Sequence, residues 1–142
     1  MKLIPVARYI GAVHVLWKLL AQRDLSQNIS HREMPTWEAH CLFVLGHPYQ
    51  SWDIIEVDER AIGAIYLSKP GGPSVPGNEI GIDLFPDYRH KGLGKQAVQM
   101  LMERHGNLRY TANTAPANEA SQALFKSLGF KLAQFTYVLE AA

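Results

Sequence analysis

The sequence predicts a single mixed α/β domain whose elements follow the order β-α-α-β-β-β-α-β-α-β. Three observations support this prediction: some segments carry apolar residues at helical spacing, others alternate apolar and polar residues, and Gly- and Pro-rich turns separate them. The 142 residues suffice for one compact domain with a core. The chain has no internal repeat, low-complexity tract or linker, so one domain is expected over residues 1–142.

In the first part of the chain, Lys2 to Val6 is predicted to form a strand and Gly11 to Arg23 a helix. A second helix should begin after Thr36, because threonine is a favourable N-cap residue. It should end at Gly46 and Pro48, two residues that commonly follow helices.

The middle of the chain predicts a hairpin of two strands, Ser51 to Val57 and Ala61 to Ser68. Three glycines and three prolines make Lys69 to Gly77 a loop. Asn78 to Phe85 then forms a strand, since its residues alternate in character. One face of this strand carries Ile80, Ile82 and Leu84, and the other carries Glu79, Gly81 and Asp83.

The last part predicts two helices and two strands. Gly92 to His105 and Asn118 to Leu128 have helical spacing of apolar residues, and the second of these is closed by Gly129. Leu108 to Asn113 is predicted to be a strand between them, and Phe130 to Glu140 the final strand.

Composition excludes several classes of protein. Hydrophobic residues make up 47% and charged residues 19%, which favours a folded, soluble domain. The formal net charge of +1 gives no broad surface for nucleic acid or an acidic membrane. The single cysteine, Cys41, excludes an internal disulfide and a thiolate metal cluster, and it favours a reducing compartment.

The apolar stretch Leu3 to Ala21 raises the question of a signal peptide or membrane span. Arg8, His14 and Lys18 interrupt it, whereas a signal peptide has an unbroken apolar region. We therefore expect an amphipathic helix in a cytoplasmic protein, with an apolar stripe formed by Ile10, Val13, Trp17 and Leu20.

The turn from Arg89 to Gly94 carries the strongest chemical signal. It has the pattern R-x-x-G-x-G and lies between a strand that ends at Phe85 and a helix start. A helix start offers unpaired N–H groups and a positive dipole end, and glycines allow phosphate oxygens to approach the backbone. Lys91 and Lys95 add charge, as does the arginine, so the turn is a candidate diphosphate site. The motif alone is equally compatible with a turn that glycines merely shape.

Two segments resemble the signatures of the Gcn5-related N-acetyltransferases. Leu84 to Gly94 is similar to the family's acetyl-CoA signature. Asn113 to Ser121 and Leu124 to Phe130 are similar to its second signature, in the expected order and separation. The resemblance extends from about Trp52 to the C terminus.

The resemblance implies a GNAT-like fold with a splayed sheet, in which the strands Asn78 to Phe85 and Leu108 to Asn113 part. The pantetheine arm of acetyl-CoA would enter this gap and pair with backbone groups of Asp83, Leu84 and Phe85. The Leu84 N–H would stabilise the oxyanion. The implied cofactor-binding residues are Asp83, Leu84, Phe85, Arg89, His90, Lys91, Gly92, Leu93, Gly94, Lys95, Asn113, Asn118, Ser121, Phe125 and Lys126.

Several of these residues also have structural interpretations. Asn118 stands at a helix N-cap position, Asn113 can simply end a strand, and Lys126 can be a solvated surface charge. For Asn118 the two roles are compatible with each other.

Direct acetyl transfer, as the resemblance implies, requires a base for the ammonium and an acid for the thiolate. Glu79 is the candidate base, although an ordinary strand-edge carboxylate is an equal alternative. Phe125 stands where many family members have an acidic tyrosine. Ser121 lies four residues earlier on the same helical face, and the resemblance implies that it is the proton donor, with an ordinary helix-surface hydroxyl as an equal alternative. Tyr137 on the last strand is a weaker substitute, since a tyrosine there is more often a core aromatic residue with a satisfied hydroxyl.

The Asn-x-x-Ser pattern is similar to that of the family branch that acetylates ribosomal-protein N termini, polyamines and nucleotide-linked amino sugars. The segments 28–40 and 47–52 are rich in histidine and aromatic residues that could hold an acceptor. The candidates are His31, Trp37, Tyr49 and Trp52, though Trp37 and Trp52 could equally be core anchors. The six histidines lack metal-ligand spacing, so no metal is expected.

The sequence therefore predicts an acetyl-CoA-dependent N-acetyltransferase that acts on a small primary amine, with an amino sugar or nucleotide-linked amino sugar favoured. The alternatives are a protein N terminus, a polyamine, and a non-catalytic CoA-binding regulatory domain. A homodimer is possible, because the last strand and the loop Lys69 to Gly77 could each mediate one or simply face water.

Overall fold

A computed structural model describes residues 1–23, 33–72 and 75–141 of the chain. Its five strands form one sheet in the order β1-β2-β3-β4-β5, and only the β4–β5 pair is parallel. The predicted mixed α/β fold is confirmed. The strands are β1 (Lys2–Pro5), β2 (Ser51–Val57), β3 (Arg60–Leu67), β4 (Asn78–Leu84) and β5 (Tyr110–Thr111). The helices are α1 (Ala12–Ala21), α2 (Trp37–Leu45), α3 (Leu93–His105) and α4 (Glu119–Ser127), with short 3₁₀ turns η1 (Val6–Arg8) and η2 (Pro86–Tyr88).

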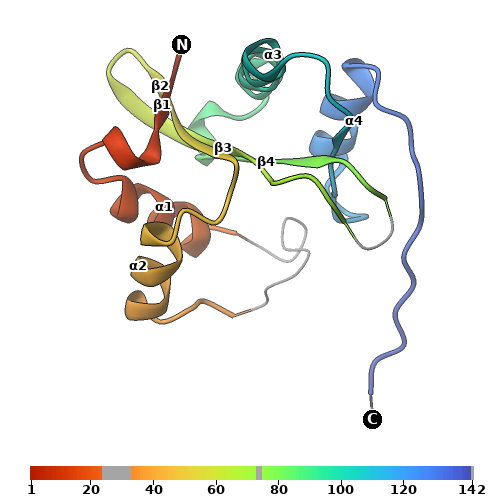
Figure 1. Cartoon of the computed structure of the whole chain (residues 1–142), viewed down its shortest axis with the longest axis horizontal. Coiled ribbons are helices and arrows are strands. Elements are labelled where there is room, and N and C mark those ends of the chain that lie inside the picture. The colour runs from red at the N-terminus through yellow and green to blue at the C-terminus, as the bar shows by residue number, and fades with distance from the viewer. Residues whose placement is uncertain (24–32, 73–74, 142) are drawn as a thin grey trace.

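The sheet separates two pairs of helices (Figure 1). Helices α1 and α2 pack on one face, and α3 and α4 pack on the other. Adjacent residues of β2 serve the two cores, because successive side chains of a strand point to opposite faces. Ile54 packs with α1 and α2, and Ile55 packs with α3. None of the helices in the described residues is long and apolar enough to cross a membrane.

The two parallel strands separate soon after they meet. The β4–β5 ladder contains only two residue pairs, Asn78 with Tyr110 and Glu79 with Thr111, while β4 continues to Leu84. The splayed sheet that the sequence predicted is thus present. Glu79 lies at the last paired position, and we call this point the fork.

Side chains cap two helices as the sequence predicted. The Thr36 hydroxyl oxygen accepts a hydrogen bond from the Ala39 N–H at 3.1 Å at the start of α2. The Asn118 side-chain oxygen accepts one from the Ser121 N–H at 3.1 Å at the start of α4. Each cap satisfies an N–H group that a helix start leaves unpaired.

The predicted final strand, Phe130 to Glu140, is wrong. After α4 the chain turns at Gly129, whose φ is +91°, and the Phe130 N–H donates to the Phe125 carbonyl at 3.0 Å. The following residues extend away from the sheet and form no strand (Figure 1). An alternating sequence predicts a strand, but the turn decides whether the chain reaches a neighbouring strand of its own sheet.

One ion pair joins three elements on the α3 side. Asp53 of β2 is buried, and Arg104 of α3 donates to its carboxylate at 2.8 Å. A second guanidinium nitrogen of Arg104 donates to the Leu3 carbonyl of β1 at 3.1 Å. Burial raises the pKa of Asp53, and the positive charge of Arg104 opposes this rise. The arginine therefore allows a carboxylate to stay ionised within the core.

We expect Arg104→Gln to lower the free energy of unfolding at pH 7.5 by roughly 2 to 3 kcal/mol. The loss should stay below that of a fully enclosed pair, because the Arg104 side chain is 40% exposed. The pKa of Asp53 is higher in the folded state than its ordinary value of 3.8. The folded state therefore holds the Asp53 proton more tightly, and stability falls as the pH rises above 3.8. Denaturant titrations at pH 7.5 and pH 4.5 should therefore show a smaller loss at pH 4.5.

Arg104→Lys is the matched control, because it keeps the positive charge near Asp53, and it should lose less stability than Arg104→Gln at pH 7.5. An equal loss for both variants, independent of pH, would show that packing of the arginine stem matters and its charge does not.

Candidate active site

The turn from Arg89 to Gly94 connects η2 to α3 and has an unusual backbone. Gly92 is the N-cap of α3 with φ +79° and ψ 0°, and no side chain caps the helix. His90 also has a positive φ, of 61°. Among the described residues, the backbone N–H groups of Leu93 and Gly94 have no backbone acceptor. They are therefore available to an anion, together with the positive end of the helix dipole.

The two glycines of the turn have different roles. A Cβ atom on Gly92 would meet no other atom within 4 Å, so the space above this residue is open. A Cβ atom on Gly94 would lie 2.9 Å from a methyl group of Leu124, so this glycine lets α3 approach α4 closely. Lys91 is exposed and Lys95 is half-buried beside the turn. An open backbone, unpaired N–H groups and two lysines fit a diphosphate.

Arg89 does not join these lysines at the rim of the turn. Its guanidinium donates to the Leu84 carbonyl at 3.0 Å and lies 3.9 Å from the Asp83 carboxylate. The sequence predicted that Arg89 adds charge around a phosphate, but the structure directs it to the end of β4. There it accompanies Gln22, whose side-chain amide also donates to the Leu84 carbonyl, at 3.1 Å.

The backbone at the end of β4 offers fewer groups than the sequence predicted. The Phe85 N–H donates to the Ile62 carbonyl of β3 at 2.9 Å, and Asp83 pairs with Ala64 of the same strand. Backbone groups of alternate residues point to opposite sides of a strand. The predicted pairing of a ligand with Asp83 and Phe85 is therefore wrong, because β3 already uses these groups. The Leu84 N–H points to the other side, toward the gap.

The Asp83 side chain is part of a small ion cluster. Arg23, which follows α1, donates to one Asp83 carboxylate oxygen at 2.9 Å. The guanidinium of Arg89 is 3.9 Å from the other carboxylate oxygen. The Asp83 side chain is 12% exposed. Burial raises the pKa of Asp83, and Arg23, Arg89 and a hydrogen bond from the Leu84 N–H oppose the rise. The negative charge of Asp83 is thus balanced by two cations.

Glu79 lies at the fork and holds both sides of it. Its carboxylate accepts a hydrogen bond from the Tyr66 hydroxyl of β3 at 3.1 Å. Its second oxygen accepts one from the side-chain amide of Asn113, which follows β5. Burial, and then the negative charge of Glu79, raises the pKa of Tyr66, so this hydroxyl remains a donor. The carboxylate is therefore fixed in position between two strands.

An aromatic group borders the Glu79 side of β4. The Tyr66 ring stacks on Tyr49 with centroids 3.9 Å apart and an interplanar angle of 5°, and Trp52 contacts Tyr49 edge-on at 4.9 Å. We call these three rings the aromatic wall. Gly81, between Glu79 and Asp83, makes room for it, because a Cβ there would lie 2.0 Å from the Tyr66 ring.

Sequence reasoning missed Tyr66, although it selected Tyr49 and Trp52. The signal lies in the register of β3 and β4, where Tyr66 stands opposite Gly81. A tyrosine ring can lie over a glycine that faces it on the neighbouring strand. Because Glu79 and Asp83 stand two positions before and after Gly81, this places the Tyr66 hydroxyl near a carboxylate. The register itself depends on tertiary structure.

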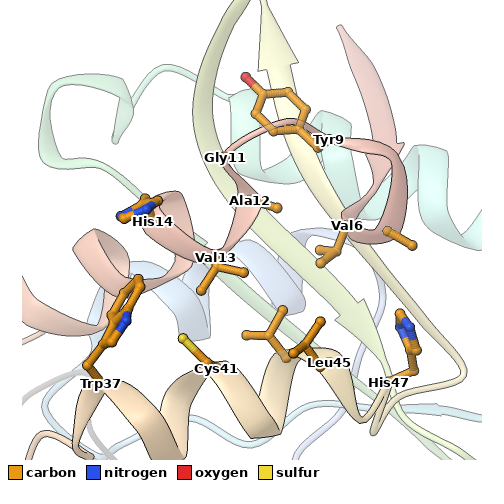
Figure 2. A pocket seen from close by; sticks show the side chains of 12 residues that line it. Val6, Tyr9, Gly11, Ala12, Val13, His14, Trp37, Cys41, Leu45 and His47 are labelled. Carbon is orange, nitrogen blue, oxygen red and sulfur yellow. The ribbon is translucent and has the colours of Figure 1, made fainter.

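Trp37 belongs to a different group of rings. It contacts His14 at 4.9 Å and Trp17 at 5.3 Å, at the junction of α1 and α2. A largely apolar cavity of about 450 Å³ lies between these helices, with Trp37, His14 and Cys41 among its lining residues (Figure 2). The predicted acceptor residues are thus divided between two places, and His31 lies outside the described residues.

The remaining predicted site residues lie on α4 and beyond it. Ser121 is half-buried in the first turn of α4, and Lys126 is exposed near its end. Phe125 is buried against Phe130, with ring centroids 5.1 Å apart, so the structure gives it a packing role. Tyr137 is 90% exposed on the extended C-terminal segment. In the described residues, no cluster of His, Cys, Asp and Glu could hold a metal ion.

Comparisons with known proteins agree with this geometry. A family model described as an acetyltransferase (GNAT) domain matches residues 10–131. No curated protein sequence matches the chain. An aminoglycoside antibiotic 6'-N-acetyltransferase from Acinetobacter haemolyticus is similar in structure, with a TM-score of 0.66 and 16% identity over 100% of this chain and 99% of that one.

Two further solved structures share the fold. An aminoglycoside N-acetyltransferase in complex with CoA has a TM-score of 0.67 and 21% identity, over 99% of this chain and 93% of that one. A ribosomal-protein-alanine N-acetyltransferase from Brucella melitensis has a TM-score of 0.66 and 18% identity, over 92% of this chain and 83% of that one. At these identities the likeness concerns the fold alone.

We expect Gly92→Val to weaken CoA binding at least tenfold, measured by isothermal titration calorimetry. The valine side chain would occupy the open space above the turn, where a diphosphate would approach the N–H groups. Gly11→Val is the matched control at the start of α1. Gly11 is also an N-cap residue with a left-handed backbone, φ +81° and ψ 11°, and an added Cβ there would meet no atom within 4 Å, so both variants carry similar backbone strain. Equal CoA affinity for the two variants would show that the turn does not hold the diphosphate.

Proposed function

The chain belongs to the GNAT acetyltransferase family, and on this premise we propose that it transfers an acetyl group from acetyl-CoA to the primary amine of an amino sugar. The protein is an N-acetyltransferase, and the acceptor is the proposed part. The observation that carries the proposal is the position of Glu79, a fixed carboxylate at the fork with the aromatic wall on its side of β4.

The residues present fit acetyl-CoA, which supplies the acetyl group as an activated thioester. The N–H groups at the start of α3, with Lys91 and Lys95, would hold the diphosphate. The Leu84 N–H, on the gap side of β4, donates to the Asp83 carboxylate and would exchange this partner for the carbonyl oxygen, whose negative charge it would stabilise during transfer. Asn118 caps α4 and would also border the cofactor, while Lys126 at the exposed end of α4 is a further candidate contact.

Glu79 is the proposed general base, which takes a proton from the acceptor ammonium either directly or through a water molecule. The two hydrogen bonds that it accepts keep the carboxylate at the fork. Ser121 in the first turn of α4 is the proposed donor of a proton to the thiolate. Tyr137 is a less favourable donor, because it lies on the exposed C-terminal segment.

The charges around the aromatic wall favour an acceptor with one ammonium group. Asp83 is balanced by Arg23 and Arg89, so Glu79 is the carboxylate that can attract a cation on this face of β4 within the described residues. A sugar ring could lie against the wall, as apolar faces of sugars pack on aromatic rings, and its hydroxyls could bond to the Arg23–Asp83 pair. A polyamine, with several charges and no hydroxyls, suits this arrangement less well.

Some structural neighbours support a sugar acceptor and others support different amines. Two are aminoglycoside acetyltransferases, one is described as a spermidine N-acetyltransferase, and one acts on a ribosomal protein. The test is to incubate the protein with acetyl-CoA and each amine of a panel, and to measure the CoA that is released with a thiol reagent. The panel contains a simple amino sugar, a nucleotide-linked amino sugar, spermidine and an N-terminal peptide.

We expect the highest kcat/KM for one of the two amino sugars. A higher value for spermidine or the peptide would overturn the proposed acceptor class and leave the family assignment intact. If the protein binds CoA but releases no CoA with any of these amines, a regulatory CoA-binding domain would be favoured instead.

We expect Glu79→Gln to lower kcat at least 100-fold, because the amide keeps the shape of the side chain but accepts no proton. The affinity for CoA should remain within a factor of about two. Glu103→Gln is the matched control, since Glu103 is exposed on α3. Activity of Glu79→Gln equal to that of the control would exclude Glu79 as the base.

A further inference from the structure

The Leu84 N–H, which is the proposed oxyanion donor, already has a partner. The ladder with β3 pairs Asp83 with Ala64, so it fixes the peptide group between Asp83 and Leu84 and directs the Leu84 N–H away from β3. The Asp83 carboxylate accepts a hydrogen bond from this N–H. The donor is therefore held by the sheet, whereas its acceptor belongs to a side chain that can change its rotamer.

Asp83 is a stronger acceptor than the group that would have to replace it. Hydrogen bonds to an ionised carboxylate are about twice as strong as those between neutral groups, and a thioester carbonyl is neutral before transfer begins. The Asp83 side chain is 12% exposed, so little water competes for it. With these two acceptors alone, the Leu84 N–H would stay with Asp83 and the acetyl group would lack its donor.

Two cations offer the Asp83 carboxylate other partners. The Arg23 Nε–H donates to one oxygen at 2.9 Å, and the Arg89 guanidinium is 3.9 Å from the other. Burial raises the pKa of Asp83, and Arg23 is the strongest of the groups that oppose this rise. Arg89 also donates to the Leu84 carbonyl at 3.0 Å, which fixes its position. Arg23 is thus the main partner that keeps Asp83 ionised.

The end of α1 contacts both the backbone of Leu84 and the side chain that occupies its N–H. Arg23 follows Gln22, whose side-chain amide donates to the Leu84 carbonyl at 3.1 Å. A guanidinium has five N–H donors, and a bidentate contact with a carboxylate uses two of them. Since the Nε–H of Arg23 already contacts Asp83, a rotation of the carboxylate toward Arg23 would complete a bidentate pair.

We propose that Arg23 is a positioning residue for acetyl transfer, which draws the Asp83 carboxylate away when acetyl-CoA binds and so releases the Leu84 N–H to the thioester carbonyl. The proposal rests on the proposed role of the Leu84 N–H and is independent of the acceptor and of Glu79. No covalent bond changes in this step, because one hydrogen bond only exchanges its acceptor. The exchange would let the protein distinguish acetyl-CoA from CoA, which has no carbonyl at this point.

An ion pair that merely ties α1 to β4 is the alternative, and it predicts a different pattern of effects. For such a pair, removal of either charge would weaken the site in the same direction. In the proposed exchange the two partners act in opposite directions. Without Arg23 the Asp83 carboxylate keeps the donor, and without the Asp83 charge the donor is free.

The first test compares the affinities for acetyl-CoA and for CoA, measured by isothermal titration calorimetry without an acceptor. The wild-type protein should bind acetyl-CoA more tightly than CoA. Arg23→Gln should weaken acetyl-CoA binding by about three- to tenfold, the net effect of one hydrogen bond, and should leave CoA binding unchanged. Arg60→Gln is the matched control, because Arg60 is exposed at the start of β3, and it should leave both affinities unchanged.

The second test is a double-mutant cycle. Asp83→Asn should bind acetyl-CoA at least as tightly as the wild type, because an amide is a weaker acceptor than a carboxylate. Arg23→Gln with Asp83→Asn should restore acetyl-CoA affinity to within a factor of about two of the wild type. Arg23→Lys, which keeps the charge without the planar fork, should fall between the wild type and Arg23→Gln.

Equal weakening of CoA and acetyl-CoA binding in Arg23→Gln would overturn the proposal and leave a structural ion pair. A loss of acetyl-CoA affinity beyond about twofold in Asp83→Asn would also overturn it, and this variant tests the proposal alone if Arg23→Gln does not fold. A wild-type protein that binds acetyl-CoA no more tightly than CoA would overturn the Leu84 donor as well. An error in the proposed acceptor would leave these titrations unchanged, because they contain no amine, and would appear in the amine panel.

Discussion

The separation of β4 and β5 after two residue pairs determines how the rest of the site is arranged. Parallel strands that part leave backbone groups without partners, and such groups are costly unless something binds them. In this chain Gln22 and Arg89 bind the Leu84 carbonyl, while the Leu84 N–H lies on the gap side of β4 and donates to the Asp83 carboxylate. A thioester carbonyl in the gap would take this donor from Asp83. Glu79, held by Tyr66 and Asn113, fixes the point at which the gap begins.

Buried polar groups are compensated throughout the described residues. The three buried polar side chains are His40, Asp53 and Asn78, and each has a partner: the Val13 carbonyl, Arg104, and Gln50 with the Ser68 carbonyl. Among the described residues no buried side-chain nitrogen or oxygen lacks a hydrogen bond. Complete pairing makes the core rigid, and a rigid core can hold the fork and the turn in fixed positions.

The two ends of the sheet differ in how they are protected. At β1, a proline, a short strand and the contact of Arg104 with the Leu3 carbonyl block further pairing, which are common ways to protect an edge. At β5 the described residues show no such protection, because no described strand lies beyond it. The inner side of β5 faces the gap in which acetyl transfer is proposed.

The sequence by itself determined the features that depend on neighbouring residues. The alternation along Asn78 to Phe85 assigned Glu79 and Ile80 to opposite faces of the strand. Glycines and lysines identified the turn before α3, and the N-cap residues Thr36 and Asn118 marked two helix starts. Only the tertiary structure decided which distant groups meet. Tyr66 reaches Glu79 through the register of two strands, and Arg23 reaches Asp83 across 60 residues. The direction of Arg89 and the path after Gly129 also depended on packing, because local sequence sets the conformation of a segment while its partners are set by the whole fold.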